Sequence, residues 1–277
     1  MYAGGSGQLR PGRWSAYSEA VTSGESSATL SPERLRQAVA ELRWYQTIDL
    51  GQGVITPGAS RSATILERLQ LPASLAGKTV LDIGAADGFF AFECERRGAG
   101  RVVATDSVHW EEGHWTGKGP FNLARRVLGS RVEDYTLDLM DLSPEAIGGP
   151  FDVVLFLGVL YHLRHPMLGL ERVAAMARDL LILETHADFL GVARPALAFY
   201  PGTELNGDPS NWFGPNLPAL TGMLRAVGFR TVHVVYRPPL ARRAAGALLR
   251  RLRGRQAGSP SLKRALAQGR VVVHARK

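Results

Sequence analysis

The stretch 78–88, KTVLDIGAADG, decides how the rest of this chain is interpreted. It begins with a short apolar run, 79–83, that is rich in β-branched residues. Two glycines, Gly84 and Gly88, then interrupt the run, and FFAF at 89–92 resumes an apolar pattern that suits a helix. The pattern predicts a strand, a tight glycine turn and a helix, an arrangement that presents backbone N–H groups to a bound ligand.

Acidic residues end this strand and the next one. Asp82 lies near the end of the first apolar run, and Asp106 follows the second, 101–105. An acid about 20 residues beyond a glycine turn is typical of nucleotide sites, where it holds ribose hydroxyls. A dinucleotide site has G-x-G-x-x-G, whereas 82–88 reads D-x-G-x-x-x-G, so its first acid could meet a cationic or hydroxyl-bearing group. The alternative is a strand, turn and helix with incidental glycines.

The composition is that of a globular protein, with 277 residues of which 45% are hydrophobic and 21% charged. No apolar run approaches the roughly 18 residues of a membrane span, and residues 1–13 lack the apolar core of a secretory signal. The single cysteine, Cys94, permits no internal disulfide. Together these features predict a cytoplasmic protein.

The net charge of +8 is concentrated in one segment, 237–264, which is rich in Arg and Lys and contains no acid. Leucines and alanines recur there four residues apart, and most arginines fall elsewhere around the helical turn, namely Arg242, Arg243, Arg250, Arg251, Arg253 and Arg255. This pattern predicts a basic amphipathic helix that contacts an anionic partner or a membrane surface. The alternative is a helix on the sheet edge with solvated arginines. Nucleic acid is less favoured because the helix has no aromatic residue to stack on bases.

Short apolar runs alternate with helical patterns along the chain, which predicts an α/β protein with a mostly parallel sheet of seven strands. The expected strands are 79–83, 101–105, 131–137, 151–157, 180–183, 231–236 and 270–274. The expected helices include 32–42, 62–69, 122–128, 166–178 and 217–227.

Three segments fall outside this alternation. Residues 1–60 comprise a polar tail, a helix and an aromatic, turn-rich stretch at 44–58. We expect that stretch to fold over a cofactor, although a plain connector with a buried tryptophan is equally consistent. Residues 187–216 lack periodicity, as binding loops and lids do. The expected organisation is an N-terminal extension, 1–60, and one domain, 61–277, with a lid at 187–216 and the basic helical insertion.

The order of motifs resembles class I S-adenosylmethionine (SAM) methyltransferases, and several pieces resemble the wobble-uridine tRNA (carboxymethyl/methoxyuridine) methyltransferase-like family. The pieces are LDIGAADGFF at 81–90, LGVLYHLRHP at 157–166, LET at 183–185, YPG at 200–202, NWFGPN at 211–216 and GRVVVHARK at 269–277. The resemblance implies a Rossmann-like sheet with helices on both faces. It also implies SAM as the cofactor and S-adenosylhomocysteine as its product.

The resemblance assigns cofactor contacts to matching positions. Methionine and ribose contacts fall to the glycine turn and the end of the next strand, that is to Asp82, Gly84, Ala85, Gly88, Asp106 and Ser107. Asp138 and Leu139 would hold the adenine; the less favoured alternative for Asp138 is a solvated acid in a turn. Leu157 and Tyr161 would line the sulfonium side, and Arg270 would reach the cofactor region.

One departure from the family bears on the reaction. The carboxymethyl-transferring relatives carry a lysine just after a tryptophan, whereas Trp44 is followed here by Tyr45 and no cation. Their RNA-binding parts are not recognisable either. We therefore expect ordinary methyl transfer, most simply O-methylation of a small molecule such as a sugar or secondary metabolite. The alternatives are tRNA wobble-uridine methylation and a non-catalytic SAM-binding scaffold.

A hydroxyl acceptor must lose its proton, and histidine is the usual base. The first candidate is His186, just past the fifth strand; the others are His162 and Tyr161, for which packing and lining the cofactor site are the alternative roles. Aromatic residues expected at the substrate or lid are Trp44, Tyr45, Tyr200, Trp212 and Phe213. No Cys/His cluster has zinc-like spacing, so no metal is predicted.

Overall fold

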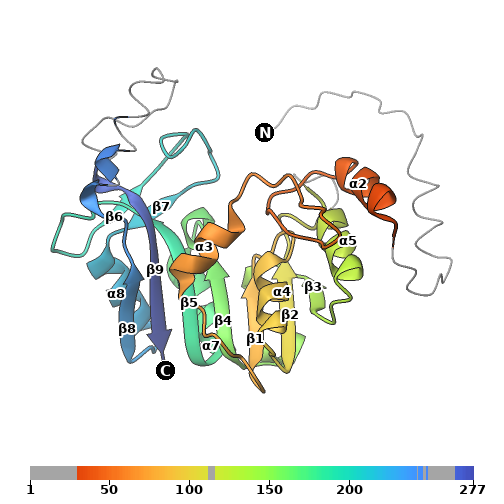
Figure 1. The fold of residues 1–277 in the computed structure, drawn as a ribbon. Coiled ribbons are helices and arrows are strands. Elements are labelled where there is room, and N and C mark those ends of the chain that lie inside the picture. Colours follow the sequence, from red (N-terminus) through yellow and green to blue (C-terminus); the bar gives the residue numbers. More distant parts are fainter. Residues whose placement is uncertain (1–29, 112–115, 242, 246–247, 249–265) are drawn as a thin grey trace, which may run out of the picture.

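A computed structural model describes residues 30–111, 116–241, 243–245, 248 and 266–277. At its centre lies a seven-stranded sheet with the order β3-β2-β1-β4-β5-β9-β8 (Figure 1). The strands are β1 Thr79–Ile83, β2 Arg101–Asp106, β3 Glu133–Thr136, β4 Phe151–Leu157, β5 Ala177–Ala187, β8 Thr231–Tyr236 and β9 Gly269–Arg276. β1 to β5 run parallel, and β9 is antiparallel to both β5 and β8. The mostly parallel, Rossmann-like sheet is confirmed.

The observed strand bounds show which strands could be predicted from local sequence alone. β1, β4 and β8 have the predicted bounds because all but one residue of each is β-branched, aromatic or leucine. β5 is longer than the predicted 180–183 because its polar ends pair with neighbours: Glu184 lies opposite Leu157 of β4 and Val272 of β9. β3 is shorter than the predicted 131–137, and its few residues pair only with β2.

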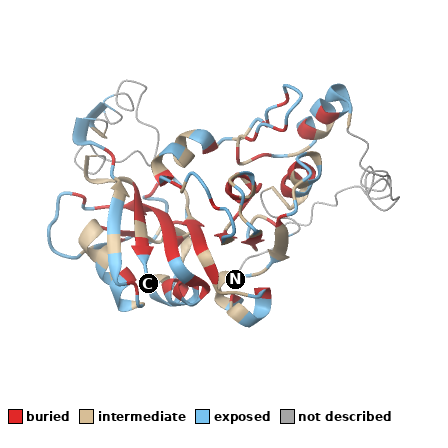
Figure 2. Ribbon diagram, turned by 60° about the horizontal axis from the view of Figure 1, so that its bottom comes forward, coloured by how far each residue is buried: buried red, intermediate tan, exposed pale blue. Residues whose placement is uncertain are grey.

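Helices cover both faces of the sheet. Two hydrophobic clusters lie between the helices and the sheet. The first includes residues of α2 Pro32–Ala40, α3 Ser62–Leu69, α4 Phe89–Arg96 and α5 Gly119–Val127. The second includes residues of α6 Pro144–Ile147, α7 Pro166–Met176 and α8 Leu217–Ala226. Successive residues of β1 alternate between them, with Val80 in the first and Leu81 in the second. Figure 2 shows the central strands as mostly buried, whereas the edge strands β3 and β8 have no buried residue. The four-residue α6 was not predicted.

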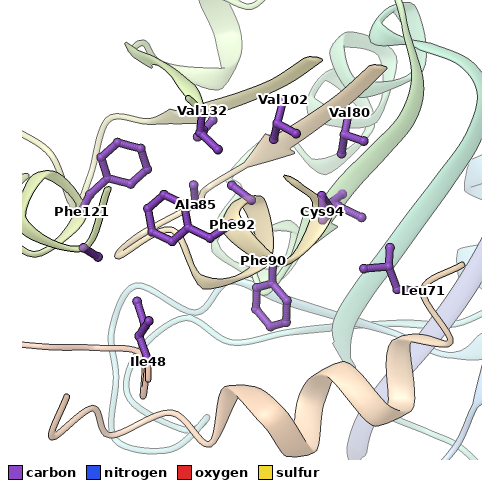
Figure 3. Packing of buried hydrophobic residues seen from close by; sticks show 14 of the residues in the cluster. Ile48, Leu71, Val80, Ala85, Phe90, Phe92, Cys94, Val102, Phe121 and Val132 are labelled. Carbon is purple, nitrogen blue, oxygen red and sulfur yellow. The ribbon is translucent and has the colours of Figure 1, made fainter. Parts of the chain in front are cut away.

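The first cluster fixes the start of α4 beside the end of β1 (Figure 3). Phe92 of α4 stacks on Phe121 of α5, with ring centroids 5.4 Å apart. The residue before α4, Gly88, has φ of 92°, and a Cβ built there would lie 2.7 Å from both rings. Only glycine therefore fits the turn, which allows the helix to begin directly after the strand.

Two segments lie beyond the carboxyl ends of the parallel strands in Figure 1. Residues 44–60 form a hairpin-like loop in which Asp49 pairs with Ile55. Residues 187–216 contain a separate antiparallel pair, β6 Leu197–Phe199 and β7 Phe213–Pro215, with a small core of its own. Strands of three residues are too short to show periodicity in sequence, which is why this segment was read as irregular.

The basic insertion is described only in part. β8 and β9, on either side of it, pair antiparallel. The predicted contact with an anionic partner or membrane surface rests mainly on arginines that lie outside the described residues, namely Arg242, Arg250, Arg251, Arg253 and Arg255. Within the described part of the chain, no helix has both the length and the apolar character that crossing a membrane requires.

Candidate active site

The glycine turn folds back against the end of β2. The N–H groups of Gly84 and Ala85 donate to the Thr105 carbonyl at 2.8 and 3.1 Å. The Ala86 N–H donates to Asp106 Oδ2 at 2.9 Å. The expectation that this turn presents free N–H groups to a ligand is therefore wrong for these three donors, since the adjacent strand already satisfies them. The ligand-facing polarity of the turn must come mainly from side chains.

Three carboxylates surround the turn, and all are buried: Asp82 and Asp87 are 1% exposed and Asp106 5%. Asp106 accepts hydrogen bonds on both oxygens, from the Ala86 and His109 N–H groups. By contrast, Asp82 Oδ2 and Asp87 Oδ1 have no hydrogen-bond partner among the described residues. Buried carboxylate oxygens without donors are costly, which points to a ligand that supplies them.

The titration of these acids reflects that cost. Burial, followed by the charge of Asp106, raises the pKa of Asp82 to about 7, against a hydrogen bond from the Ala91 backbone. Burial also raises the pKa of Asp87 to about 6, although the backbones of Gln46 and Tyr45 oppose the shift. A cationic ligand would restore the charged forms. The methionine moiety of SAM carries an ammonium and a sulfonium, so the residues present fit this cofactor.

The N-terminal loop is bonded directly to the glycine turn. Asp87 Oδ2 accepts the backbone N–H groups of Tyr45 and Gln46, each at 2.7 Å. In return, Gln46 Oε1 accepts the Phe89 N–H at the start of α4, at 2.9 Å. Sequence reasoning missed Asp87 and Gln46 as site residues. The position of Asp87 next to Gly88 inside the motif was the available signal.

His109 is a further residue that the sequence analysis missed. Its ring lies 5.6 Å from that of Tyr45, and its Nδ1 is 3.5 Å from Asp106 Oδ2. Burial alone would lower the pKa of His109, but its hydrogen bond to Asp106 and the charges of Asp106 and Asp87 outweigh burial and raise it. His109 thus adds a basic group to the acidic cluster.

The residues predicted to bind adenine lie together beyond β3. Asp138 is exposed and caps a single 3₁₀ turn, Leu139–Asp141, by accepting the Met140 N–H at 2.8 Å. Ser107 Oγ donates to Asp138 Oδ2 at 3.5 Å. The structure therefore brings Ser107, Asp138 and Leu139 to one place, next to the end of β2.

A second polar group lies at the ends of β4 and β5. Arg270 of β9 forms two hydrogen bonds with Glu184 of β5, and its guanidinium carbon lies 4.8 Å from the Tyr161 ring centroid. Burial would lower the pKa of Arg270, but Glu184 and Tyr161 outweigh it and raise the pKa further above the ordinary arginine value. Arg270 therefore stays charged, and Glu184 balances that charge.

Tyr45 joins the N-terminal loop to this group. Burial raises the pKa of Tyr45, and the neighbouring Tyr161 and Glu184 add to the shift while Arg270 opposes it. Of the predicted cofactor residues, Tyr161 and Arg270 are therefore brought together. Leu157, also predicted there, ends β4 and is half-buried.

The two candidate histidines have different surroundings. His162 is half-buried, and its Nδ1 lies 3.1 Å from the Ser210 carbonyl and 3.0 Å from Ser210 Oγ. Burial lowers the pKa of His162, against the carbonyl of Ser210 and the charge of Asp208. His186 is only 6% exposed, and its Nε2 lies 3.2 Å from the hydroxyl of Tyr200.

The predicted lid aromatics divide between core and surface. Tyr200 is 2% exposed and donates its hydroxyl to Asp188 Oδ2 at 2.8 Å, so it anchors the lid to the end of β5. Trp212 and Phe213 are half-buried, and the Trp212 N–H donates to the Tyr161 carbonyl at 2.8 Å. Trp44 instead packs in the core, where its indole N–H donates to the Val39 carbonyl at 3.0 Å. That placement favours the connector reading of Trp44.

In the ranges that the structure describes, no group of three or more His, Cys, Asp and Glu side chains is placed to hold a metal ion.

The seven-stranded sheet, with acids at the ends of β1 and β2, matches the Rossmann-like fold of methyltransferases. The chain belongs to the methyltransferase domain family, whose sequence profile, described as "Methyltransferase domain", matches residues 59–234. The family uses SAM as methyl donor, and the chain is a SAM-dependent methyltransferase.

Two curated relatives share one name and match this chain over about half of their length. The chain is 31% identical over 164 residues to "tRNA U34 carboxymethyltransferase" of Ectopseudomonas mendocina (strain ymp), covering 58% of this chain and 48% of that protein. It is 33% identical over 163 residues to the protein of the same name from Dichelobacter nodosus (strain VCS1703A), covering 57% and 47%. The chain thus spans about half the length of these relatives.

Solved structures support the fold. The N-terminal domain of EvdMO1, crystallised in the presence of S-adenosylhomocysteine and D-fucose, matches with a TM-score of 0.60 and 17% identity. The match covers 91% of this chain and 99% of that one. At this identity the likeness concerns the fold alone.

Proposed function

We propose that this methyltransferase transfers the methyl group of SAM to a hydroxyl on a small molecule, such as a sugar or secondary metabolite, with His162 as general base. The observation that carries the proposal is the contact between His162 Nδ1 and the Ser210 carbonyl at 3.1 Å. A carbonyl oxygen can only accept, so Nδ1 carries the ring proton. Nε2 is then left with a lone pair, and no described residue hydrogen-bonds to it.

The surroundings of His162 suit a base that works near neutral pH. Burial holds its pKa below the ordinary histidine value, so the ring is neutral and able to accept a proton at pH 7. Its ring lies against Tyr161, with centroids 4.2 Å apart, which restricts its orientation. A base of this kind contributes about 10²–10⁴-fold to a reaction.

The remaining groups bind and position. SAM, when bound, supplies an already activated methyl group, so alignment of donor and acceptor provides most of the rate. Asp82 and Asp87 would meet its cationic methionine end, Asp106 its ribose, and Ser107, Asp138 and Leu139 its adenine. Tyr161 and Arg270, with Tyr45 above them, would border the reacting atoms.

His186 suits a structural role better than a proton transfer. The Tyr200 hydroxyl donates its hydrogen to Asp188, so its oxygen can only accept the hydrogen bond from His186 Nε2. Nε2 of His186 therefore carries a proton and cannot take one from a substrate. The ring is buried beneath β7, where a Cβ built on Gly214 would lie 3.1 Å from His186 Cδ2. We therefore assign His186 to holding the lid segment and His162 to the chemistry.

A second candidate is methylation of the tRNA wobble uridine, favoured by the names of the curated relatives. One feature favours the small-molecule proposal instead: Tyr45 stands at the position after the tryptophan where those relatives are expected to carry a lysine. The backbone N–H of Tyr45 is bonded to Asp87, so this position already serves to fasten the loop to the turn.

Initial rates with a panel of hydroxylated sugars and metabolites, and with bulk tRNA, test both candidates. For the accepted small molecule, we expect His162→Gln to lower kcat about 100-fold or more while leaving SAM affinity unchanged. His165→Gln, which changes an exposed histidine at the start of α7, serves as the matched control. Equal kcat values for wild type and His162→Gln would contradict the assignment of the base. Methylation of tRNA alone would establish the second candidate.

A further inference from the structure

A turn in the lid segment, 208–212, is bonded to the residues that follow β4. The Trp212 N–H donates to the Tyr161 carbonyl at 2.8 Å, and the Ser210 carbonyl meets His162 Nδ1. Asp208 Oδ1 accepts both the N–H of Ser210, at 2.8 Å, and its hydroxyl, at 2.7 Å. These bonds hold the Ser210 side chain in one orientation beside the His162 ring.

The direction of this hydrogen-bond chain is fixed by chemistry. An ionised carboxylate can only accept, so Ser210 Oγ gives its hydrogen to Asp208 Oδ1. The same oxygen, 3.0 Å from His162 Nδ1, can then only accept from the ring. The carbonyl of Ser210 also accepts. Both neighbours of Nδ1 are therefore acceptors, and the Nδ1–H tautomer satisfies both.

We propose that Asp208 and Ser210 are positioning residues of the lid that set the tautomer of His162 and thereby leave Nε2 as the base. Neither residue needs to touch substrate. The lid thus has a part in the chemistry beyond covering the site, because displacing the 208–212 turn removes both acceptors from Nδ1. The ring would then be free to place its proton on Nε2, where it blocks proton transfer from the acceptor. The kinetic consequence rests on the proposed function of His162; the tautomer itself does not.

Nitrogen NMR tests the tautomer directly. Long-range ¹H–¹⁵N correlation of the histidine rings, recorded with S-adenosylhomocysteine present and His162 assigned through His162→Gln, distinguishes Nδ1–H from Nε2–H. We expect Nδ1–H in the wild type, a partial shift toward Nε2–H in Ser210→Ala and Asp208→Asn, because the Ser210 carbonyl stays at Nδ1 as an acceptor in both, and recovery in Ser210→Thr, which keeps a hydroxyl. The control is Glu204→Gln, an exposed acid of the same segment. An Nε2–H tautomer in the wild type, or the same tautomer in all variants, would overturn the inference.

Kinetics with the accepted small molecule give the second readout. We expect Ser210→Ala and Asp208→Asn to lower kcat about tenfold with SAM affinity within twofold of wild type, and Ser210→Thr to restore kcat. The charged and titratable neighbours of His162 are Asp208, Arg270, His109 and Tyr161. Because the negative charge of Asp208 raises the pKa of His162, its removal should move the acidic limb of the kcat–pH profile to lower pH.

The two readouts separate this inference from the proposed function. A purely structural role for the turn predicts a raised KM, an unmoved acidic limb and an unchanged tautomer, and that result would overturn the inference. If the tautomer depends on Asp208 and Ser210 but no hydroxyl compound is methylated, the positioning holds and the proposed function fails. Bound S-adenosylhomocysteine, measured by calorimetry in every variant, shows that each one is folded.

Discussion

Replacing Asp82 with asparagine should make the ligand-free protein more stable while weakening its hold on SAM. Asp82 is 1% exposed, and its Oδ2 has no partner among the described residues. Its pKa rises from 3.8 to about 7 on folding, chiefly through burial. At 1.36 kcal/mol per pKa unit, the charged form costs the folded state about 4 kcal/mol, part of which comes from repulsion by Asp106. Asparagine has nearly the same shape and carries no charge.

The pH dependence follows from the sign of this shift. Between about pH 4 and pH 7 the folded state holds a proton on Asp82 that the unfolded state has lost, so unfolding releases it. The free energy of unfolding therefore falls as pH rises through this interval, and above pH 7 Asp82 lowers it by a constant amount. Asp82→Asn should remove that fall, and its advantage over wild type should grow from near zero at pH 4 to its full value by about pH 8.

Urea unfolding of the ligand-free protein at a series of pH values measures this. The matched control is Glu67→Gln, which removes an exposed carboxylate on α3 and should leave the profile unchanged. Calorimetry with SAM supplies the other half. Loss of a hydrogen bond to a charged group, about 1.5–3 kcal/mol, should weaken binding by roughly 10- to 150-fold. An Asp82→Asn protein that is less stable than wild type at pH 8, or binds SAM equally well, would refute the reasoning.

Four further results are expected. Asp106→Asn should weaken SAM binding severely while keeping an acceptor for the Ala86 N–H, whereas Asp106→Ala should also loosen the glycine turn; unchanged affinity in the folded Asn variant would show that Asp106 does not meet the ribose. SAM and S-adenosylhomocysteine should bind in preference to carboxy-SAM in a calorimetric competition, and the reverse order would count against methyl transfer. Residues 187–216 should gain hydrogen-exchange protection when S-adenosylhomocysteine and acceptor bind together, and equal protection in both states would argue against a lid. Replacing Arg250, Arg251, Arg253 and Arg255 with glutamine should leave SAM affinity unchanged but abolish salt-sensitive binding to anionic vesicles; a wild type that binds no anionic vesicle or RNA at low salt would contradict this.

The sequence predicted the elements whose pattern is local. β1, β4, α3 and β8 have the expected bounds because apolar periodicity and glycine or proline boundaries suffice to define them. The acids Asp82 and Asp106 also lie where strand ends place them, at the carboxyl edge of adjacent parallel strands. Residue type and spacing therefore placed these two acids side by side, and their contact with the cofactor stays a prediction.

Contacts between distant parts of the chain could not be predicted in this way. The bonds from the loop at 45–46 to Asp87 join residues about 40 apart, and the bond between His162 and Ser210 joins residues 48 apart. Nothing local to Ser210 indicates that it faces a histidine ring. The preference for His186 as base likewise rested on its position after a strand, whereas its burial beneath β7 depends on how the lid folds.

The most direct test of the account is to follow the methyl group itself. The protein is incubated with SAM carrying a trideuterated methyl group and with separate pools of hydroxylated small molecules and of tRNA, and each pool is analysed by mass spectrometry. We expect the label to enter a small molecule as an ether methyl, and the rate of labelling to fall about 100-fold or more in His162→Gln but not in His165→Gln. Label found only in tRNA, or in neither pool although SAM binds, would contradict it.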